Sequence, residues 1–151
     1  MRKAILAAAA VAAGVLVAGH ALMPRTMTPS AAADRPGMVP IPLDAPATEQ
    51  HVYPPSVRVG DFDGAYKLAT LYTSALAAGH RVALWESEAG VLKSEAYPVD
   101  EFIYVLEGEV VTTDADGTRR EFRAGDAFVL PRGWAGTWDM KTRFRKIIVN
   151  F

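Results

Sequence analysis

The sequence predicts an all-β domain, a sandwich or small barrel of short strands, preceded by an apolar leader and a proline-rich arm. From Arg58 onward, short segments rich in β-branched and aromatic residues alternate with turn signals that contain glycine, at the spacing of about 8 to 12 residues typical of such folds. One of these signals, Asp116-Gly117, strongly indicates a hairpin because glycine accepts the positive φ that tight turns need. With 151 residues, 50% of them hydrophobic, the chain can bury the core of one ordinary domain.

Residues 1–33 have the pattern of a secretory signal. Arg2 and Lys3 precede a run, residues 4–19, that contains only Ala, Val, Ile, Leu and Gly, and small residues follow it. The run is short for a spanning helix, which needs about 20 residues. We therefore expect a periplasmic or secreted protein. The alternative is an uncleaved N-terminal membrane anchor that holds the domain outside the cytoplasm, in which case this segment is the protein's one contact with the membrane.

Residues 34–57 belong to a proline-rich linker or arm, and residues 58–151 to the folded domain. Eight prolines occur in the 32 residues from Pro24 to Pro55, among small residues and few large apolar ones. Such a composition favours extended, unpaired backbone. The arm is expected to act as a spacer, with Val52 and Tyr53 attaching its end to the domain.

The composition excludes several classes of function. The chain has no cysteine, which removes disulfides, thiol catalysis and cysteine-based zinc sites. Its formal net charge is −1, and residues 34–151, with 13 basic and 17 acidic side chains, carry −4. No nucleic-acid partner is expected, since such surfaces need clustered Lys and Arg.

The pattern of apolar residues and turns predicts seven strands. They are expected near residues 67–73, 81–86, 101–106, 109–113, 119–123, 126–130 and 143–150.

The strand at 101–106 is apolar on both faces, which predicts burial inside the barrel and beneath another layer or subunit. A homodimer is expected for this reason. Glu101 shares one of these faces with Ile103 and Val105, and in the last strand Lys146 similarly lies among apolar neighbours. A charge on a buried face is costly unless it is paired or bound to a metal. The alternative is that each side chain reaches water or a backbone group at a strand end.

Two segments resemble the cupin signature. In the first, 100–108, Glu101 is followed by six residues and a glycine; in the second, 125–133, a glycine is followed by five residues and then Pro131-Arg132-Gly133. The segment 134–138 with the later Arg145-Lys146 resembles the subgroup related to the cupin domain of ureidoglycine aminohydrolase. The resemblance, over roughly 80–151, implies a jelly-roll β-barrel, often dimeric, with any site inside the barrel mouth.

The resemblance also implies where a metal would bind, and this sequence departs from the pattern there. Metal-binding cupins place two histidines shortly before the glutamate and a third three positions after the glycine of Pro-x-Gly. The corresponding residues here are Glu95, Tyr97 and Gly136, so that Glu101 alone remains of the four usual ligands. We expect no cofactor and no metal ligands; a divalent ion is the less favoured alternative because too few donors converge.

Two functions remain open for the barrel. In the first, it binds a small polar metabolite, with Tyr97, Arg132, Trp134 and Lys146 as ligand-binding residues, through stacking and a few polar contacts. In the second, the protein is a small cupin enzyme, similar to ureidoglycine aminohydrolase or a metal-independent isomerase, lyase or hydrolase. Glu101 and Glu95 would then be its catalytic acid and base. The opposing interpretation is structural, with Glu95 on an exposed loop and Glu101 paired with Lys146.

Overall fold

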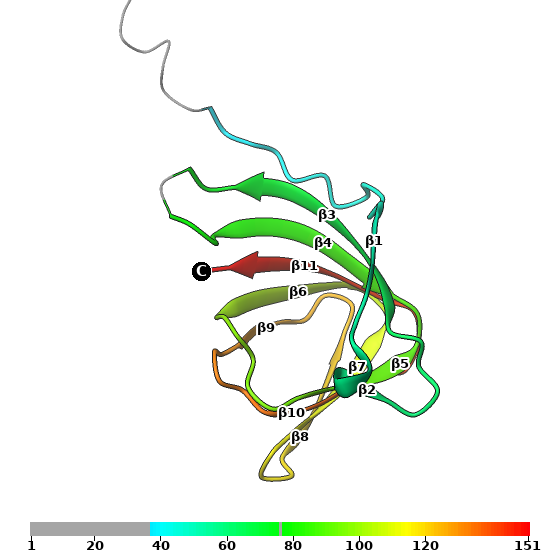
Figure 1. Ribbon diagram of the computed structural model, residues 1–151. Helices are drawn as coiled ribbons and strands as arrows, with labels where there is room; N and C mark the ends of the chain where they lie inside the picture. Colours follow the sequence, from blue (N-terminus) through cyan, green and yellow to red (C-terminus); the bar gives the residue numbers. More distant parts are fainter. Residues whose placement is uncertain (1–36, 76) are drawn as a thin grey trace, which may run out of the picture. The chain divides into compact units, whose positions relative to one another are not determined.

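The computed structural model describes residues 37–75 and 77–151, within which residues 38–151 form one compact unit. The predicted signal or anchor, residues 1–33, lies outside the described residues. The predicted all-β class is confirmed, because two antiparallel sheets build the unit (Figure 1). In the described part of the chain, no helix combines the length and apolar character that crossing a membrane requires.

The two sheets face one another as a jelly-roll sandwich, and their strands are far from sequential. The six-stranded sheet has the order β1 (Glu49–Val52), β3 (Ala65–Thr73), β4 (Arg81–Ser87), β11 (Phe144–Asn150), β6 (Glu101–Glu107) and β9 (Ala127–Leu130). The five-stranded sheet has the order β2 (Arg58–Val59), β5 (Gly90–Ser94), β10 (Gly136–Met140), β7 (Glu109–Asp114) and β8 (Arg119–Arg123). Between β1 and β2 lies one turn of 3-10 helix, η2 (Pro55–Val57).

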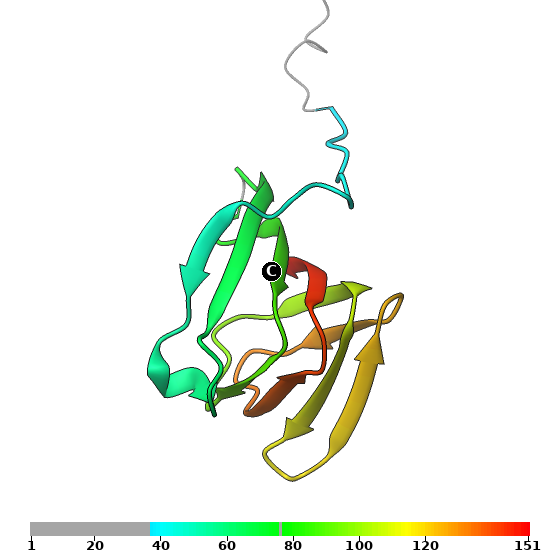
Figure 2. The ribbon, with the colours of Figure 1, turned by 90° about the vertical axis from the view of Figure 1, so that its right-hand side faces the viewer.

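The hairpin predicted at Asp116-Gly117 joins β7 to β8 (Figure 2). The N–H of Gly117 donates to the carbonyl of Asp114 at 2.9 Å, and Gly117 has a φ of +87°. The carboxylate of Asp116 accepts the N–H of Thr118 at 2.8 Å. Both features are those of a tight turn in which glycine supplies the positive φ and aspartate orders the backbone.

Alternation along β6 and β11 places two charged residues inside the sandwich. In β6, Glu101, Ile103 and Val105 are buried, whereas Phe102 and Tyr104 on the opposite face are 38% and 36% exposed. In β11, Lys146 is buried on the face that Phe144 and Ile148 share. The sequence prediction for these inner faces is therefore confirmed, while within a single described chain the outer face of β6 stays open.

Aromatic rings run through the core as a nearly continuous series. Successive rings, with centroids 3.8 to 6.4 Å apart, are Phe122, Phe128, Trp138, Phe144, Trp85, Tyr66 and Tyr53. Offset and edge-on contacts of this kind each add about 0.5–1.5 kcal/mol beyond the burial of their area. The series links the five-stranded sheet to the segment before η2.

The second half of the proline-rich segment packs as part of this unit. Glu49–Val52 pairs with β3 as an edge strand, and Ala47 is 5% exposed. A carbonyl at Ala45 accepts a hydrogen bond from Arg145 of β11. This part of the arm therefore contacts the outer side of the six-stranded sheet.

All seven predicted strands exist, with ends shifted by at most two residues, as β3, β4, β6, β7, β8, β9 and β11. The sequence did not indicate β1, β2, β5 and β10. Two of these, β5 and β10, begin at a glycine, and each runs only five residues. The pairing of β10 with β5 and β7, and of β5 with β2, defines them more than any alternation of apolar residues.

Candidate functional site

A cavity of about 560 Å³ opens between the two sheets. All three tryptophans of the chain, Trp85, Trp134 and Trp138, line it. The loop that follows β5 supplies a further part of its wall, as do Tyr53, Pro54, Ser56 and Val57. A concave, aromatic-lined space of this size, with a few polar groups, is typical of small-molecule sites.

A buried ion pair lies at the inner end of the cavity. The carboxylate of Glu101, 2% exposed, accepts hydrogen bonds from Lys146 Nζ at 3.1 Å, Asn150 Nδ2 at 3.0 Å and the hydroxyl of Tyr97 at 2.9 Å. Asn150 is held in turn by Arg81, whose Nε donates to its Oδ1 at 2.8 Å. Because both oxygens of Glu101 are engaged, the burial of the charge is compensated. The predicted pairing of Glu101 with Lys146 is present.

Lys146 presents its ammonium to the cavity against two indole rings. Its Nζ lies 5.1 Å from the ring centroid of Trp85, on the neighbouring strand β4, and 4.6 Å from that of Trp138, on the opposite sheet. Both distances suit cation–π attraction, which is strong where water is excluded. Of the three N–H donors of the ammonium, one is used by Glu101.

Tyr97 and Trp134 are fixed to one another through the backbone. The N–H of Tyr97 donates to the carbonyl of Trp134 at 2.8 Å, and the N–H of Gly133 donates to the carbonyl of Tyr97 at 2.7 Å. The indole N–H of Trp134 donates to Asp114 Oδ1 at 2.9 Å, and Arg120 pairs with the same carboxylate. This holds the ring of Trp134 at the cavity.

Burial keeps the two cavity phenols protonated. It raises the pKa of Tyr97, and the negative charge and hydrogen bond of Glu101 raise it further. Burial also raises the pKa of Tyr53, aided by Tyr66 and opposed by the indole N–H of Trp85. Both hydroxyls are therefore donors at neutral pH.

The predicted site residues do not all meet. Tyr97, Trp134 and Lys146 line the cavity, as does Glu95, whose side chain is exposed at its rim. Glu101 lies behind Lys146 and Tyr97 and is not among the lining residues. Arg132 is exposed and is also absent from the lining; its backbone N–H donates to Asp100 at 3.0 Å.

Four site residues escaped the sequence analysis. Trp85 and Trp138 belong both to the core and to the cavity wall. Tyr53 was expected to attach the arm, and Asn150 shares the inner face of β11 with Lys146. The alternation of β11 could have indicated Asn150, whereas Tyr53 reaches the cavity through the path of the arm.

The residues at the metal positions of cupins do not fit a transition metal. Tyr97 and Asn150 donate to Glu101, and an ammonium already lies against its other oxygen. At Gly136, a Cβ atom would overlap the carbonyl oxygen of Thr113 and lie 2.6 Å from Cζ2 of Trp134, so the indole takes the space of a side chain there. No group of three His, Cys, Asp or Glu that could hold a metal occurs among residues 37–75 and 77–151.

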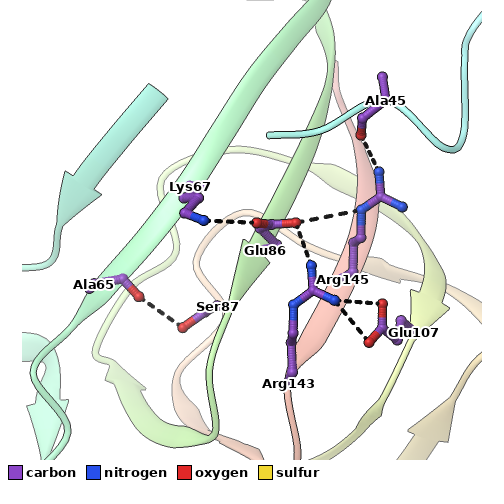
Figure 3. Close-up of polar contacts among 8 residues, drawn as sticks. All are labelled: Ala45, Ala65, Lys67, Glu86, Ser87, Glu107, Arg143 and Arg145. Atoms are coloured by element: carbon purple, nitrogen blue, oxygen red, sulfur yellow. Dashed lines mark hydrogen bonds and ion pairs between the residues drawn. The ribbon is translucent and has the colours of Figure 1, made fainter. Parts of the chain in front are cut away.

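A second charged cluster joins β3, β4, β6 and the start of β11, apart from the cavity (Figure 3). The carboxylate of Glu86 contacts Lys67 at 3.5 Å, Arg143 at 3.0 Å and Arg145 at 3.7 Å. Arg143 also forms two hydrogen bonds with Glu107 at 3.1 Å. The pKa of Arg143 is raised by Glu107 and Glu86. These ion pairs link the strands of the sheet, although the buried Nε of Arg145 has no hydrogen-bond partner among the described residues.

Comparisons with known proteins agree with this fold. Residues 76–147 match the sequence model of a family described as EutQ-like cupin domain. The fold resembles a DUF861-family protein of unknown function from Pseudomonas syringae pv. tomato (TM-score 0.64, 19% identity, covering 74% of this chain and 46% of that one). This chain thus spans about half the length of that protein.

Two EutQ structures are similar as well. One is a putative ethanolamine utilization protein Q from Salmonella typhimurium (TM-score 0.51, 22% identity, covering 68% of this chain and 91% of that one). The other is the EutQ protein of Clostridium difficile (TM-score 0.51, 18% identity, covering 64% and 76%). At these identities the likeness concerns the fold. No curated protein matches the sequence.

Proposed function

The chain belongs to the cupin superfamily and carries a cupin domain of EutQ-like type, and on that premise we propose that its barrel binds a small polar metabolite without a metal ion. The observation that carries the proposal is the cavity of about 560 Å³, lined by three tryptophans and by the ammonium of Lys146. Indole faces stack on rings and on sugar-like molecules, while Lys146, Tyr97 and Tyr53 offer polar contacts. The subgroup related to ureidoglycine aminohydrolase is not confirmed.

The state of Glu101 favours binding over catalysis. In an acid–base enzyme, Glu101 and Glu95 would exchange protons with the substrate, yet both oxygens of Glu101 accept hydrogen bonds from the protein. Glu95 is exposed at the rim of the cavity. The enzymatic alternative therefore has less support than a site for recognition.

Tryptophan fluorescence and thermal shift together test the proposal. All three indoles line the cavity, so a panel of neutral and charged ring-bearing metabolites should contain compounds that change the emission and raise the Tm. These effects should be the same with EDTA as with added Mn²⁺ or Zn²⁺. Replacing Trp134 by Ala should weaken them, and replacing Tyr72, at an exposed position of β3, by Ala should not.

Two results would contradict the proposal. If no member of the panel affects either signal, a binding role fails. If the purified protein contains stoichiometric Mn, Fe, Ni or Zn, the metal-free site fails, whatever the panel shows.

We also propose that the protein is exported, because residues 1–33 have the pattern of a signal or anchor. Fractionation of cells that express the full chain should find the domain in the periplasm or medium, or in the membrane fraction if the segment is retained. Neutralising Arg2 and Lys3 should reduce export. A cytoplasmic product with an intact N-terminus would contradict it.

We further propose that the protein forms a homodimer through the outer face of β6 and β9. Phe102 and Tyr104 are exposed there beside Val129, which is 52% exposed and pairs with Phe102. An apolar face of this kind is typical of a self-complementary interface. Light scattering should report a dimer that Phe102→Asp disrupts and that Val59→Asp, on the other sheet, leaves intact. A wild-type monomer would contradict it.

A further inference from the structure

Hydrogen-bond donors outnumber acceptors at the inner end of the cavity. Trp85 is 4% exposed, and its Nε1 has no acceptor at hydrogen-bonding geometry in the part of the chain that the structure describes. This N–H lowers the pKa of the Tyr53 hydroxyl, so the phenol oxygen is its neighbour, at a geometry that falls short of a full hydrogen bond. Buried donors usually have a full partner, so this donor is only partly satisfied.

Tyr53 and Lys146 add further donors at the same place. Tyr53 lines the cavity and keeps its proton, while the indole of Trp85 lies toward its oxygen. Lys146 lines the cavity too, and Glu101 takes one of the three N–H donors of its ammonium. Glu101 already accepts three hydrogen bonds, so it is not the acceptor for Tyr53 or for the other N–H groups of Lys146.

The hydrogen-bond network at this end joins two cationic side chains and one anionic side chain. Lys146 and Arg81 are cationic, and Arg81 is close enough to lower the pKa of both Tyr53 and Tyr97. Glu101 carries the opposing negative charge. At the rim, the exposed Lys93 and Glu95 cancel one another. A ligand group with one negative charge and several acceptor lone pairs would balance both the charge and the donors.

We propose that the inner end of the cavity binds the carboxylate of a small organic acid, whose ring or apolar body lies against Trp134 and Leu92. The hydroxyl of Tyr53 and the ammonium of Lys146 are the donors to this carboxylate. A charged acceptor strengthens such hydrogen bonds, particularly where indoles exclude water. This inference rests on the proposed binding function and narrows it to one chemical class.

Benzoate and benzamide form a matched pair of probes, because they share a ring and differ in charge. Titration of the full protein, followed by tryptophan emission and by calorimetry at constant ionic strength, should show benzoate binding at least about tenfold more tightly, the effect expected of one hydrogen bond to a charged group. Tyr53→Phe should remove about tenfold of the benzoate affinity and leave benzamide affinity within about twofold. Tyr72→Phe, at an exposed position of β3 outside the cavity, is the matched control and should change neither.

The contribution of Lys146 is tested with a double variant, because replacing Lys146 alone leaves Glu101 buried without its counter-ion. The double variant Glu101→Gln/Lys146→Met removes both charges and should lose the preference for benzoate over benzamide.

The outcomes separate this inference from the proposed function. Equal affinity for the two probes, or a preference that survives Tyr53→Phe and the double variant, would overturn the carboxylate site. If neutral ring compounds bind and benzoate does not, the carboxylate site also fails while metabolite binding stands. If neither the probes nor the wider panel bind, both proposals fail together.

Discussion

Lys146 reaches Glu101 from a backbone position that faces a different residue. Lys146 of β11 pairs with Val105 of β6, whereas Glu101 of β6 pairs with Asn150 of β11. Glu101 lies four residues before Val105 on β6, a distance of roughly 13 Å along the strand. The long side chain of Lys146 therefore runs along the inner face of the sheet before its Nζ meets the carboxylate at 3.1 Å. The two indoles of Trp85 and Trp138 hold its end at the cavity.

Replacing Glu101 by Gln should lower the free energy of unfolding by about 3 kcal/mol, because it leaves the ammonium of Lys146 buried without a counter-charge. Urea unfolding followed by circular dichroism measures the loss. Glu109→Gln, an exposed carboxylate on β7, is the control and should cost less than about 0.5 kcal/mol. Equal stability of the Glu101 variant and the wild type would show that the pair is dispensable.

Replacing Gly136 by Ala should destabilise the fold by about 1–3 kcal/mol, the cost of inserting a methyl group into a packed region. The new Cβ would overlap the carbonyl oxygen of Thr113 and press on the ring of Trp134, so the emission of the folded protein should change as well. Gly37→Ala, where the Cβ meets nothing within 4 Å, serves as the control. An unperturbed Gly136 variant would mean that the site has room for a side chain, such as a metal ligand.

Acid should release the ring of Trp134 from Asp114. The hydrogen bond from the indole N–H of Trp134, with that from Arg120, holds the pKa of Asp114 below its usual range. A lowered pKa in the folded state means that the interaction stabilises the fold above the ordinary pKa of aspartate and is lost as the pH falls through the folded value, below about pH 4. The NMR signal of the Trp134 indole N–H should follow this transition.

Asp114→Asn should abolish the transition, because an amide does not titrate. Asp116→Asn should retain it, since the carboxylate of Asp116 is bound to the backbone of Thr118 and not to the indole. A Trp134 signal that titrates identically in the Asp114 variant would assign the effect to another group.

Replacing Glu86 by Gln should lower the free energy of unfolding by about 2 kcal/mol, the size of a hydrogen bond to a charged group. Without the carboxylate, the cations Lys67, Arg143 and Arg145 would repel one another (Figure 3). Added salt should recover part of this loss by screening the cations. Glu107→Gln, at the exposed end of the same cluster, should cost less than about 1 kcal/mol. Binding in the cavity should be unchanged in both variants, and a change would connect the two regions.

The choice of hairpin and of strand faces was predictable because it depends on neighbours in sequence. Asp116-Gly117 has few alternatives to a tight turn, and alternation in 101–106 assigns Glu101 to the inner face whichever strands lie beside it. The same holds for Lys146. Four of the strands were not predictable from pattern, since β10 starts at Gly136 and owes its strand character to β5 and β7 on either side.

By itself the sequence determined an all-β domain with cupin motifs and two buried opposite charges, because periodicity and turn chemistry are local properties. The tertiary structure alone decided how those charges are used. Strand register brings Lys146, Asn150 and Tyr97 onto one carboxylate, and the path of the arm brings Tyr53 to the same cavity from outside the motifs. These contacts join residues that are distant in the chain, so they cannot be predicted from local sequence patterns.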